Sequence, residues 1–267
     1  MGKVIILTDT TDIPLTMAGE FAGACWSADT KNHEKNFKRG LECLRLNHGR
    51  ALEYPQIYME ISGYSARVIR EFTRHIGGAP TYLQESTRYV DSTNFEIVVP
   101  HTIQKDEKAL NTYLKVYRNI QEGIKELEVC GVPKEDSAML LPLGMTTKII
   151  FRTNLRHLID ICAQRLCSRA YWEIRELVKD ILDSLAFYSD EWKFLVEEEK
   201  IFVPKCKKLG YCPEKFSCGL TPKKNDGIAA HRGFDVSNRS SHNKKIKIKI
   251  KMRKFLLKIK KTLEKLV

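Results

Sequence analysis

Helical periodicity constrains this chain more than any other feature of its sequence. Residues 104–129 and 154–188 each predict a long helix, and residues 14–26 and 33–46 predict two shorter ones. The apolar face of the helix over 104–129 consists of Leu110, Leu114, Tyr117, Ile120, Ile124 and Leu127.

Strand patterns are short by comparison. Compact or alternating apolar residues predict strands over 4–7, 56–62 and 95–99. Long helices beside so few strands favour an α+β fold, in which a small mixed or antiparallel sheet carries several helices. Gly63 is predicted to open a further helix. That helix must end near Gly77-Gly78-Ala79-Pro80, because two glycines and a proline do not continue a helix.

Positive charge is concentrated at the end of the chain. The net charge is +12, but residues 240–267 hold ten Lys and one Arg against one Glu, which leaves only +2 for the other 239 residues. The predicted organisation is a main domain over 1–195, a Cys-containing extension over 196–225, and a linker with a basic low-complexity tail over 226–267. Nucleic acid is therefore not expected as a partner, except through this tail.

Apolar runs in the sequence are short. The longest, such as Val4–Leu7 and Met139–Leu143, are far below the ~20 residues that a spanning helix needs. The chain also becomes acidic at Asp9, too early for a secretory signal. We therefore expect a cytoplasmic protein with no membrane partner.

The eight cysteines do not form the pattern of a disulfide framework. Five of them are scattered through apolar or helical contexts and predict buried, reduced thiols: Cys25, Cys43, Cys130, Cys162 and Cys167. Cys206, Cys212 and Cys218 are spaced evenly by six and are weak candidates for a zinc site, which His231 or another cysteine would have to complete. The alternative is a lid or an oligomer contact, and no metal is the main expectation.

The first segment with a chemical signature runs from Arg74 to Tyr89. It combines two arginines, a histidine, hydroxyl side chains and the Gly77-Gly78 turn around a helix end. Arginine suits forked hydrogen bonds to phosphate, and glycine lets backbone N–H groups approach an anion. The segment is a candidate nucleotide or phosphate site; the alternative is a surface loop rich in salt bridges.

The second segment runs from Asn154 to Arg175. Steps of three and four place a mixed polar and apolar stripe on one predicted helix face. The stripe consists of Asn154, His157, Ile161, Arg165, Ser168 and Trp172. Such a stripe suits the wall of a pocket for a polar aromatic ring, or else a helix interface with buried polar pairs.

Together the two segments resemble the flavin-dependent thymidylate synthases. The first family block matches at Arg74-His75 and at Ser86-Thr87-Arg88-Tyr89, with a spacer two residues longer than usual. The second block matches at Leu140–Leu143, Asn154, Arg165 and Trp172–Arg175. The resemblance covers about residues 1–190. It indicates a divergent branch, because the chain departs from the family pattern at Tyr54, Ile76, Ala138 and Tyr171.

The resemblance implies an enzyme that methylates dUMP to dTMP. The family binds FAD, reduces it with NADPH and takes the carbon from 5,10-methylenetetrahydrofolate. The flavin chemistry needs no cysteine nucleophile. The family is also a homotetramer whose active sites are shared between subunits, and it has the thymidylate synthase-complementing fold.

The resemblance also implies individual roles. Arg165 would face the uracil ring and, with Ser86, is a candidate catalytic residue. The dUMP set is Ser86, Arg88, Arg165 and Gln84. The FAD set is Arg74, His75, Asn154, Asp160 and the position held here by Ile76.

Two other functions are weighed against this one. The departures at Tyr54, Ile76 and Ala138 favour a related flavin-dependent enzyme that acts on another pyrimidine nucleotide or adds a hydroxymethyl group. A non-enzymatic nucleotide- or nucleic-acid-binding protein is the third hypothesis, and its active part would be the basic tail. A flavin absorption band separates this third hypothesis from the other two.

Overall fold

The computed structural model describes residues 2–224. A first compact unit ends at Lys208 and a second begins at Leu209. The predicted boundaries at 195 and 225 remain predictions. The basic tail and His231 lie outside the described residues.

A four-stranded sheet forms the centre of the first unit. The strands are β1 (Lys3–Ile6), β2 (Gln56–Ser65), β3 (Thr81–Gln84) and β4 (Thr146–Asn154). Their order is β1-β2-β4-β3, and every neighbouring pair is antiparallel. The predicted α+β class with a small antiparallel sheet is confirmed.

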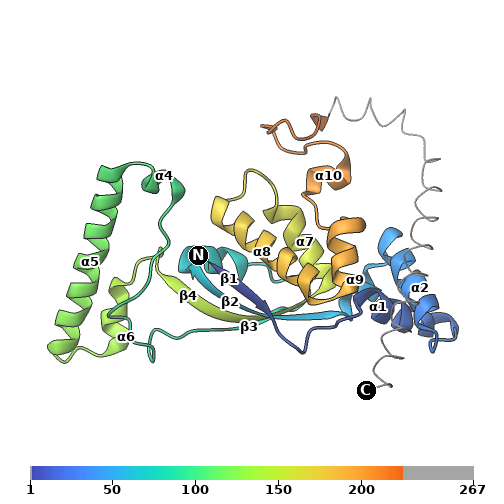
Figure 1. Cartoon of the computed structure of the whole chain (residues 1–267), viewed down its shortest axis with the longest axis horizontal. Helices are drawn as coiled ribbons and strands as arrows, with labels where there is room; N and C mark the ends of the chain where they lie inside the picture. The colour runs from blue at the N-terminus through green and yellow to red at the C-terminus, as the bar shows by residue number, and fades with distance from the viewer. Residues whose placement is uncertain (1, 225–267) are drawn as a thin grey trace, which may run out of the picture. The chain divides into compact units, whose positions relative to one another are not determined.

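One face of this sheet carries the main core. Ile57, Met59 and Ile61 of β2 and Ile149 and Phe151 of β4 are fully buried, as the alternation of a half-buried strand requires. Two helices, α7 (Leu155–Arg165) and α8 (Trp172–Tyr188), pack on this face (Figure 1). The core therefore fixes α7 directly against the sheet that it follows in the chain.

The remaining helices of the first unit surround this core. They are α1 (Pro14–Gly23), α2 (His33–Arg45), α3 (Ala66–Phe72), α9 (Asp190–Lys193) and α10 (Lys205–Leu209), whose last residue belongs to the second unit. Short 3₁₀ segments lie at Ala24–Trp26, Gly49–Glu53 and Ala138–Leu140, and a π-helical turn lies at Phe194–Glu198.

A separate helical arm, residues 95–145, lies between β3 and β4 in the chain. It contains α4 (His101–Gln104), α5 (Glu107–Val129) and α6 (Lys134–Ser137), and α5 stands apart from α7 and α8 in Figure 1. A second, small core around Phe95, Tyr117 and Ile124 holds it together. The predicted helix over 104–129 is confirmed from Glu107 onward as α5, whereas Gln104 ends α4.

Four sequence-based assignments need correction. Residues 95–99 form only a single bridge, Ile97 to Met145, because the chain enters the arm there. Gly63 does not open a helix. It continues β2 with φ +70° at a bulge, and α3 starts only after Ser65, whose Oγ accepts from Val68 N. Strands β3 and β4 were not predicted.

The predicted helix over 154–188 is wrong in its middle. It is interrupted between Arg165 and Trp172, so Ser168 and Trp172 do not continue the stripe of α7. No glycine or proline marks this break. A tertiary contact sets the new start instead, since buried Glu173 accepts from Ser65 N at 2.6 Å and from Ser65 Oγ at 2.7 Å.

Among the described residues, no helix is long and apolar enough to cross a membrane.

The crossing of α1 and α2 depends on two glycines. A Cβ on Gly40 would lie 1.9 Å from the Leu15 carbonyl oxygen, and one on Gly19 would lie 1.9 Å from that of Asn36. We predict that Gly40→Ala lowers the free energy of unfolding by about 2–3 kcal/mol, because two helix backbones must separate. Gly123→Ala is the matched control. Its Cβ would meet only Leu140 at 3.8 Å, so this change in the middle of α5 should be neutral or stabilising. Equal denaturant midpoints for the two variants would contradict the close crossing.

Candidate active site

The two polar segments meet at Arg165, the last residue of α7. Its Nε donates to His75 Nε2 at 2.8 Å, and its Nη1 lies 3.4 Å from Glu71 Oε2. The Arg165 side chain remains 23% exposed. The first segment therefore orients the guanidinium group without covering it.

His75 is a buried hydrogen-bond acceptor. Because Nε2 accepts from Arg165, the ring carries its proton on Nδ1. Burial, followed by the positive charge of Arg165 and the proximity of His157, lowers the pKa of His75 to about 4. The imidazole is thus neutral near pH 7, and only in this form can it hold Arg165.

Asn154 joins the sheet, the helix and the glycine turn. It ends β4 and caps α7, since its Oδ1 accepts from His157 N at 2.9 Å. Its Nδ2 donates to the carbonyl of Gly78 at 3.2 Å. Gly78 has φ +72°, and a Cβ there would lie 2.8 Å from the Cβ of His157. Only glycine lets this turn pack so closely against α7.

Arg152 holds the other side of the same turn. Its Nη2 donates to the carbonyl of Ala79 at 2.9 Å and lies 3.3 Å from Thr81 Oγ1. Ala79 has φ +49°, a left-handed conformation that an alanine adopts only when other contacts hold it. The turn is therefore fixed from two neighbouring positions of β4.

Strand β3 then carries the chain away from Arg165. Thr81 pairs with Arg152, Gln84 pairs with Ile149, and Glu85 N donates to the Lys148 carbonyl at 2.9 Å. Asn154 lies six residues after Lys148 along β4, a span of about 20 Å. The predicted dUMP residues Gln84, Ser86 and Arg88 thus lie at the opposite end of β4 from the predicted FAD residue Asn154.

The Ser86–Arg88 pair forms its own local structure. Ser86 Oγ accepts from Arg88 N at 3.3 Å, and Arg88 Nε lies 2.7 Å from Glu135 Oε2 of α6. Both side chains of this ion pair are more than half exposed, so it contributes little stability and leaves Arg88 available to an anion. Gln84 is exposed and lies near Thr147, with 3.4 Å between Nε2 and Oγ1.

The other predicted FAD residues are more exposed than His75 and Asn154. Arg74 is exposed, and the side chain of Ile76 is 81% exposed beside buried His75. Asp160 is exposed on α7, and its charge raises the pKa of His157 against the larger effect of burial. Of the predicted set, the described structure brings together Arg165, His75 and Asn154.

The departures from the family pattern have distinct surroundings. Tyr54 is 51% exposed and its ring lies 4.6 Å from that of Phe21. Tyr171 lies under the guanidinium of Arg67 at 4.3 Å. Ala138 begins a 3₁₀ segment of the arm, away from the glycine turn in the chain.

None of the eight cysteines, all of which lie within the described residues, forms a disulfide. Cys43 and Cys162 are buried as predicted, but Cys25 and Cys130 are exposed and Cys167 is partly so. Over residues 2–224, no three His, Cys, Asp or Glu side chains gather in a way that would hold a metal. Cys206 and Cys212 are buried and Cys218 is exposed, so the weak zinc hypothesis gains no support.

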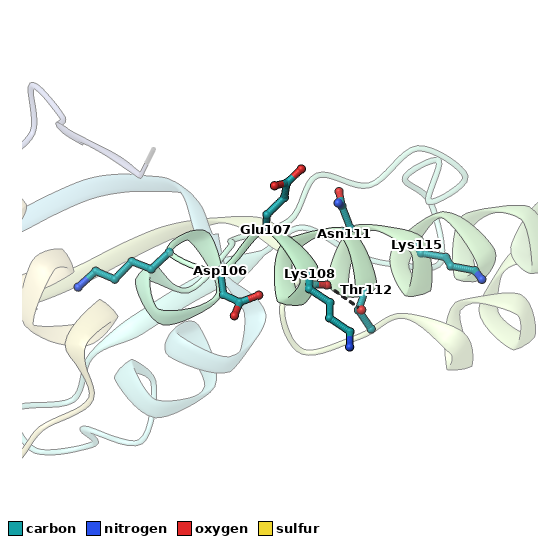
Figure 2. A pocket seen from close by; sticks show the side chains of 7 residues that line it. Asp106, Glu107, Lys108, Asn111, Thr112 and Lys115 are labelled. Atoms are coloured by element: carbon teal, nitrogen blue, oxygen red, sulfur yellow. Dashed lines mark hydrogen bonds between the residues drawn. The ribbon is translucent and has the colours of Figure 1, made fainter.

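Figure 2 shows an open hollow at the start of α5. Its lining is Lys105, Asp106, Glu107, Lys108, Asn111, Thr112 and Lys115. Asp106 caps the helix by accepting from Ala109 N at 2.8 Å, and Thr112 donates to the Lys108 carbonyl at 2.8 Å. These polar groups serve the helix itself, and none belongs to the set around Arg165.

Comparison with known proteins decides the family. The model of the family "Thymidylate synthase complementing protein" matches residues 7–187. The chain belongs to this family. It is 33% identical over 202 residues to the flavin-dependent thymidylate synthase of Pyrococcus furiosus, which covers 74% of this chain and 80% of that protein. The enzyme of the same name from Clostridium tetani is 28% identical over 243 residues, 82% of this chain and 94% of that protein.

A solved structure agrees on the fold of this thymidylate synthase family. Thymidylate synthase X from Helicobacter pylori, crystallised with FAD and dUMP, matches with a TM-score of 0.57 and 20% identity. The match covers 75% of this chain and 99% of that chain. The antiparallel sheet with its packed helices is thus the fold of this family.

Two residues that hold Arg165 or the glycine turn in place lie outside the family blocks. Glu71 lies in the last turn of α3, which ends at Phe72, and His75 lies beyond that end, so no helical spacing in the sequence indicates that both contact Arg165. Arg152 lies two residues before Asn154, on the opposite face of the strand from Phe151. Finding it required β4, which the sequence pattern did not reveal.

The buried neutral state of His75 predicts a pH dependence. The pKa of His75 is about 4 in the folded chain against 6.5 as its ordinary value. Between these values the unfolded chain binds a proton that the folded chain does not, so stability is complete above pH 6.5 and falls as the pH drops toward 4. The loss should reach about 3 kcal/mol at most. Urea unfolding at pH 7 and pH 4.5 measures it.

His75→Gln is the matched variant, because its amide oxygen reaches the position of Nε2, keeps the acceptor for Arg165 and removes the titrating ring. It should show a smaller loss between the two pH values. The dependence of stability on pH should not vanish in this variant, because burial also lowers the pKa of His157. The same pH slope in both proteins would contradict this account of His75.

Proposed function

We propose that this chain converts dUMP to dTMP, taking a methylene group from 5,10-methylenetetrahydrofolate and two electrons from NADPH, with FAD as cofactor. The observation that carries the proposal is the contact of Arg165 with His75. It joins the two family blocks into one site in a chain whose relatives are flavin-dependent thymidylate synthases. The relative solved with FAD and dUMP supports the same ligands.

The residues present fit FAD by their donor chemistry. Arg74 is exposed beside the glycine turn, and buried His157 lies under that turn. Hydrogen-bond donors around a glycine turn suit the carbonyl and phosphate oxygens of a flavin nucleotide. Bound FAD would supply the hydride and carbon transfer that side chains do not perform.

The chain's own residues would bind and polarise the nucleotide. His75 and Glu71 hold Arg165 so that its free N–H groups meet a uracil carbonyl, where negative charge develops when carbon 5 becomes nucleophilic. Ser86 and Arg88 would bind the dUMP phosphate, with Gln84 beside them. Asn154 would act on FAD mainly by fixing the turn, since both ends of its amide already bond within the chain.

A tritium-release assay with 5-labelled dUMP, methylenetetrahydrofolate and NADPH tests the proposal. Mass spectrometry of the product distinguishes a methyl from a hydroxymethyl group, and other pyrimidine nucleotides serve as competing substrates. If the purified protein remains colourless after incubation with FAD, the proposal that it is a flavoenzyme is wrong.

Arg165→Ala is predicted to lower dTMP formation by more than about 100-fold, because it removes the cation that would stabilise the uracil charge. FAD content, measured from the flavin absorption band, should stay near that of the unmodified protein. Gln164→Ala, an exposed neighbour on the last turn of α7, is the control and should keep full activity. Turnover within tenfold for Arg165→Ala would remove this residue from the site.

We further propose a homotetramer whose sites are shared between subunits. Support comes from the strand register, since within one chain the Ser86–Arg88 loop lies at the opposite end of β4 from Asn154, which holds the glycine turn. We also propose a cytoplasmic location, because the phosphorylated substrate and NADPH are charged metabolites of that compartment.

If active sites are shared between subunits, two inactive variants should complement each other. Arg165→Ala and Arg88→Ala should each form inactive oligomers. Mixing them under conditions that exchange subunits should restore part of the activity, because some sites then combine an intact Arg165 from one chain with an intact Arg88 from another. Light scattering gives the subunit number, and mixing two samples of the same variant is the control. No recovery after verified exchange would contradict shared sites.

A further inference from the structure

His157 is a buried histidine with one ring nitrogen that the fold does not use. Its side chain is 4% exposed, and its Nδ1 lies 2.7 Å from Thr153 Oγ1. Nε2 makes no hydrogen bond with any residue from 2 to 224. Nε2 is not among the fully enclosed polar atoms that lack a partner, so it is open to a ligand atom that approaches past Gly77.

The Thr153 contact determines which nitrogen carries the proton. Thr153 is 1% exposed, and its hydroxyl has no other hydrogen-bond partner in the described part of the chain. If Nδ1 donated to this oxygen, the hydroxyl hydrogen would be buried without an acceptor. The satisfied arrangement has Thr153 donating to Nδ1, which places the ring proton on Nε2. Nε2–H is therefore a donor without an acceptor.

The glycine turn leaves this donor accessible. A Cβ on Gly77 would lie 3.5 Å from Cδ2 of His157 and 3.8 Å from its Nε2, so any larger residue would cover this edge of the ring. The other edge is occupied, since Gly78 packs on the Cβ of His157. The ring of His75 lies near that of His157, with 6.3 Å between the two ring centroids.

We propose that Nε2–H of His157 donates a hydrogen bond to an acceptor atom of FAD seated at the Gly77-Gly78 turn. This inference rests on the proposed flavoenzyme function. It assigns to His157 a binding role that the family blocks quoted above do not include. The surroundings of His157 favour the neutral ring that this role needs. Burial lowers the pKa of His157, and the neighbouring His75 is also neutral because it accepts from Arg165.

Two amide substitutions separate the two ring nitrogens. In His157→Asn the amide reaches the position of Nδ1 and keeps the Thr153 contact but loses the donor at Nε2. In His157→Gln the amide nitrogen reaches the position of Nε2. Quenching of flavin fluorescence on titration into the apo full-length chain should show affinity about three- to tenfold weaker for His157→Asn and within about twofold for His157→Gln.

A change at Thr153 tests the tautomer without touching the ring. Thr153→Val removes the hydroxyl that donates to Nδ1, so part of the population moves its proton to Nδ1 and FAD affinity should fall severalfold. Thr153→Ser keeps the hydroxyl and should keep the affinity. Nitrogen-15 NMR of the apo chain should find the proton on Nε2 in the unmodified protein and a mixture in Thr153→Val.

Three results would overturn the proposal: unchanged affinity in His157→Asn, equal loss in both His157 variants, or a proton on Nδ1 in the unmodified protein. Each is distinguishable from failure of the proposed function, in which the unmodified chain itself would bind no FAD. Repeating the titrations with riboflavin locates the acceptor. A loss that persists with riboflavin places it on the ring system, and a loss confined to FAD places it on the phosphates or the adenosine.

Discussion

The site depends first on the junction at Asn154, where a strand becomes a helix within one residue. The same amide caps α7 and binds the carbonyl of the glycine turn, so one side chain couples the sheet, the helix and that turn. The core makes this coupling rigid, since Phe151 before the junction and Leu155 and Leu158 after it are fully buried. The positions of the side chains on α7, from His157 to Arg165, therefore depend on this junction.

Burial of two neutral imidazoles beside an arginine follows from that geometry. A protonated histidine would place a second cation next to Arg165, whereas a neutral ring can accept from it. His75 therefore acts on the proposed chemistry through Arg165, and its hydrogen bond determines which guanidinium N–H groups remain free. Glu71 adds a negative charge on the same side, 3.4 Å from Nη1, which helps to orient the guanidinium group.

Local patterns in the sequence predicted the parts of the fold that depend on periodicity, and missed those that depend on distant contacts. The apolar face of α5 and the alternation in β2 are visible within a short window. Strand β4 is not, because Lys148, Ile150 and Arg152 on its outer face mix charge with apolar residues. The break before α8 depends on Glu173 meeting Ser65, more than 100 residues away. Arg165, His75 and Asn154 were found from motifs, but Arg152 and Glu71 became visible only with the register of β4 and the end of α3.

Strand β3 gives the clearest reason why one chain is an incomplete enzyme on our proposal. Its pairing with β4 moves the Ser86–Arg88 loop about 20 Å along the sheet from the Asn154 junction, farther than an arginine side chain reaches. The loop is also exposed, and so are Tyr82, Leu83 and Tyr89 around it. An exposed sheet edge with apolar side chains is a surface at which another chain can pair. If a second copy covers it, assembly buries the edge and brings a phosphate site to the Arg165 of the neighbouring chain. Assembly and catalysis would then depend on the same contact.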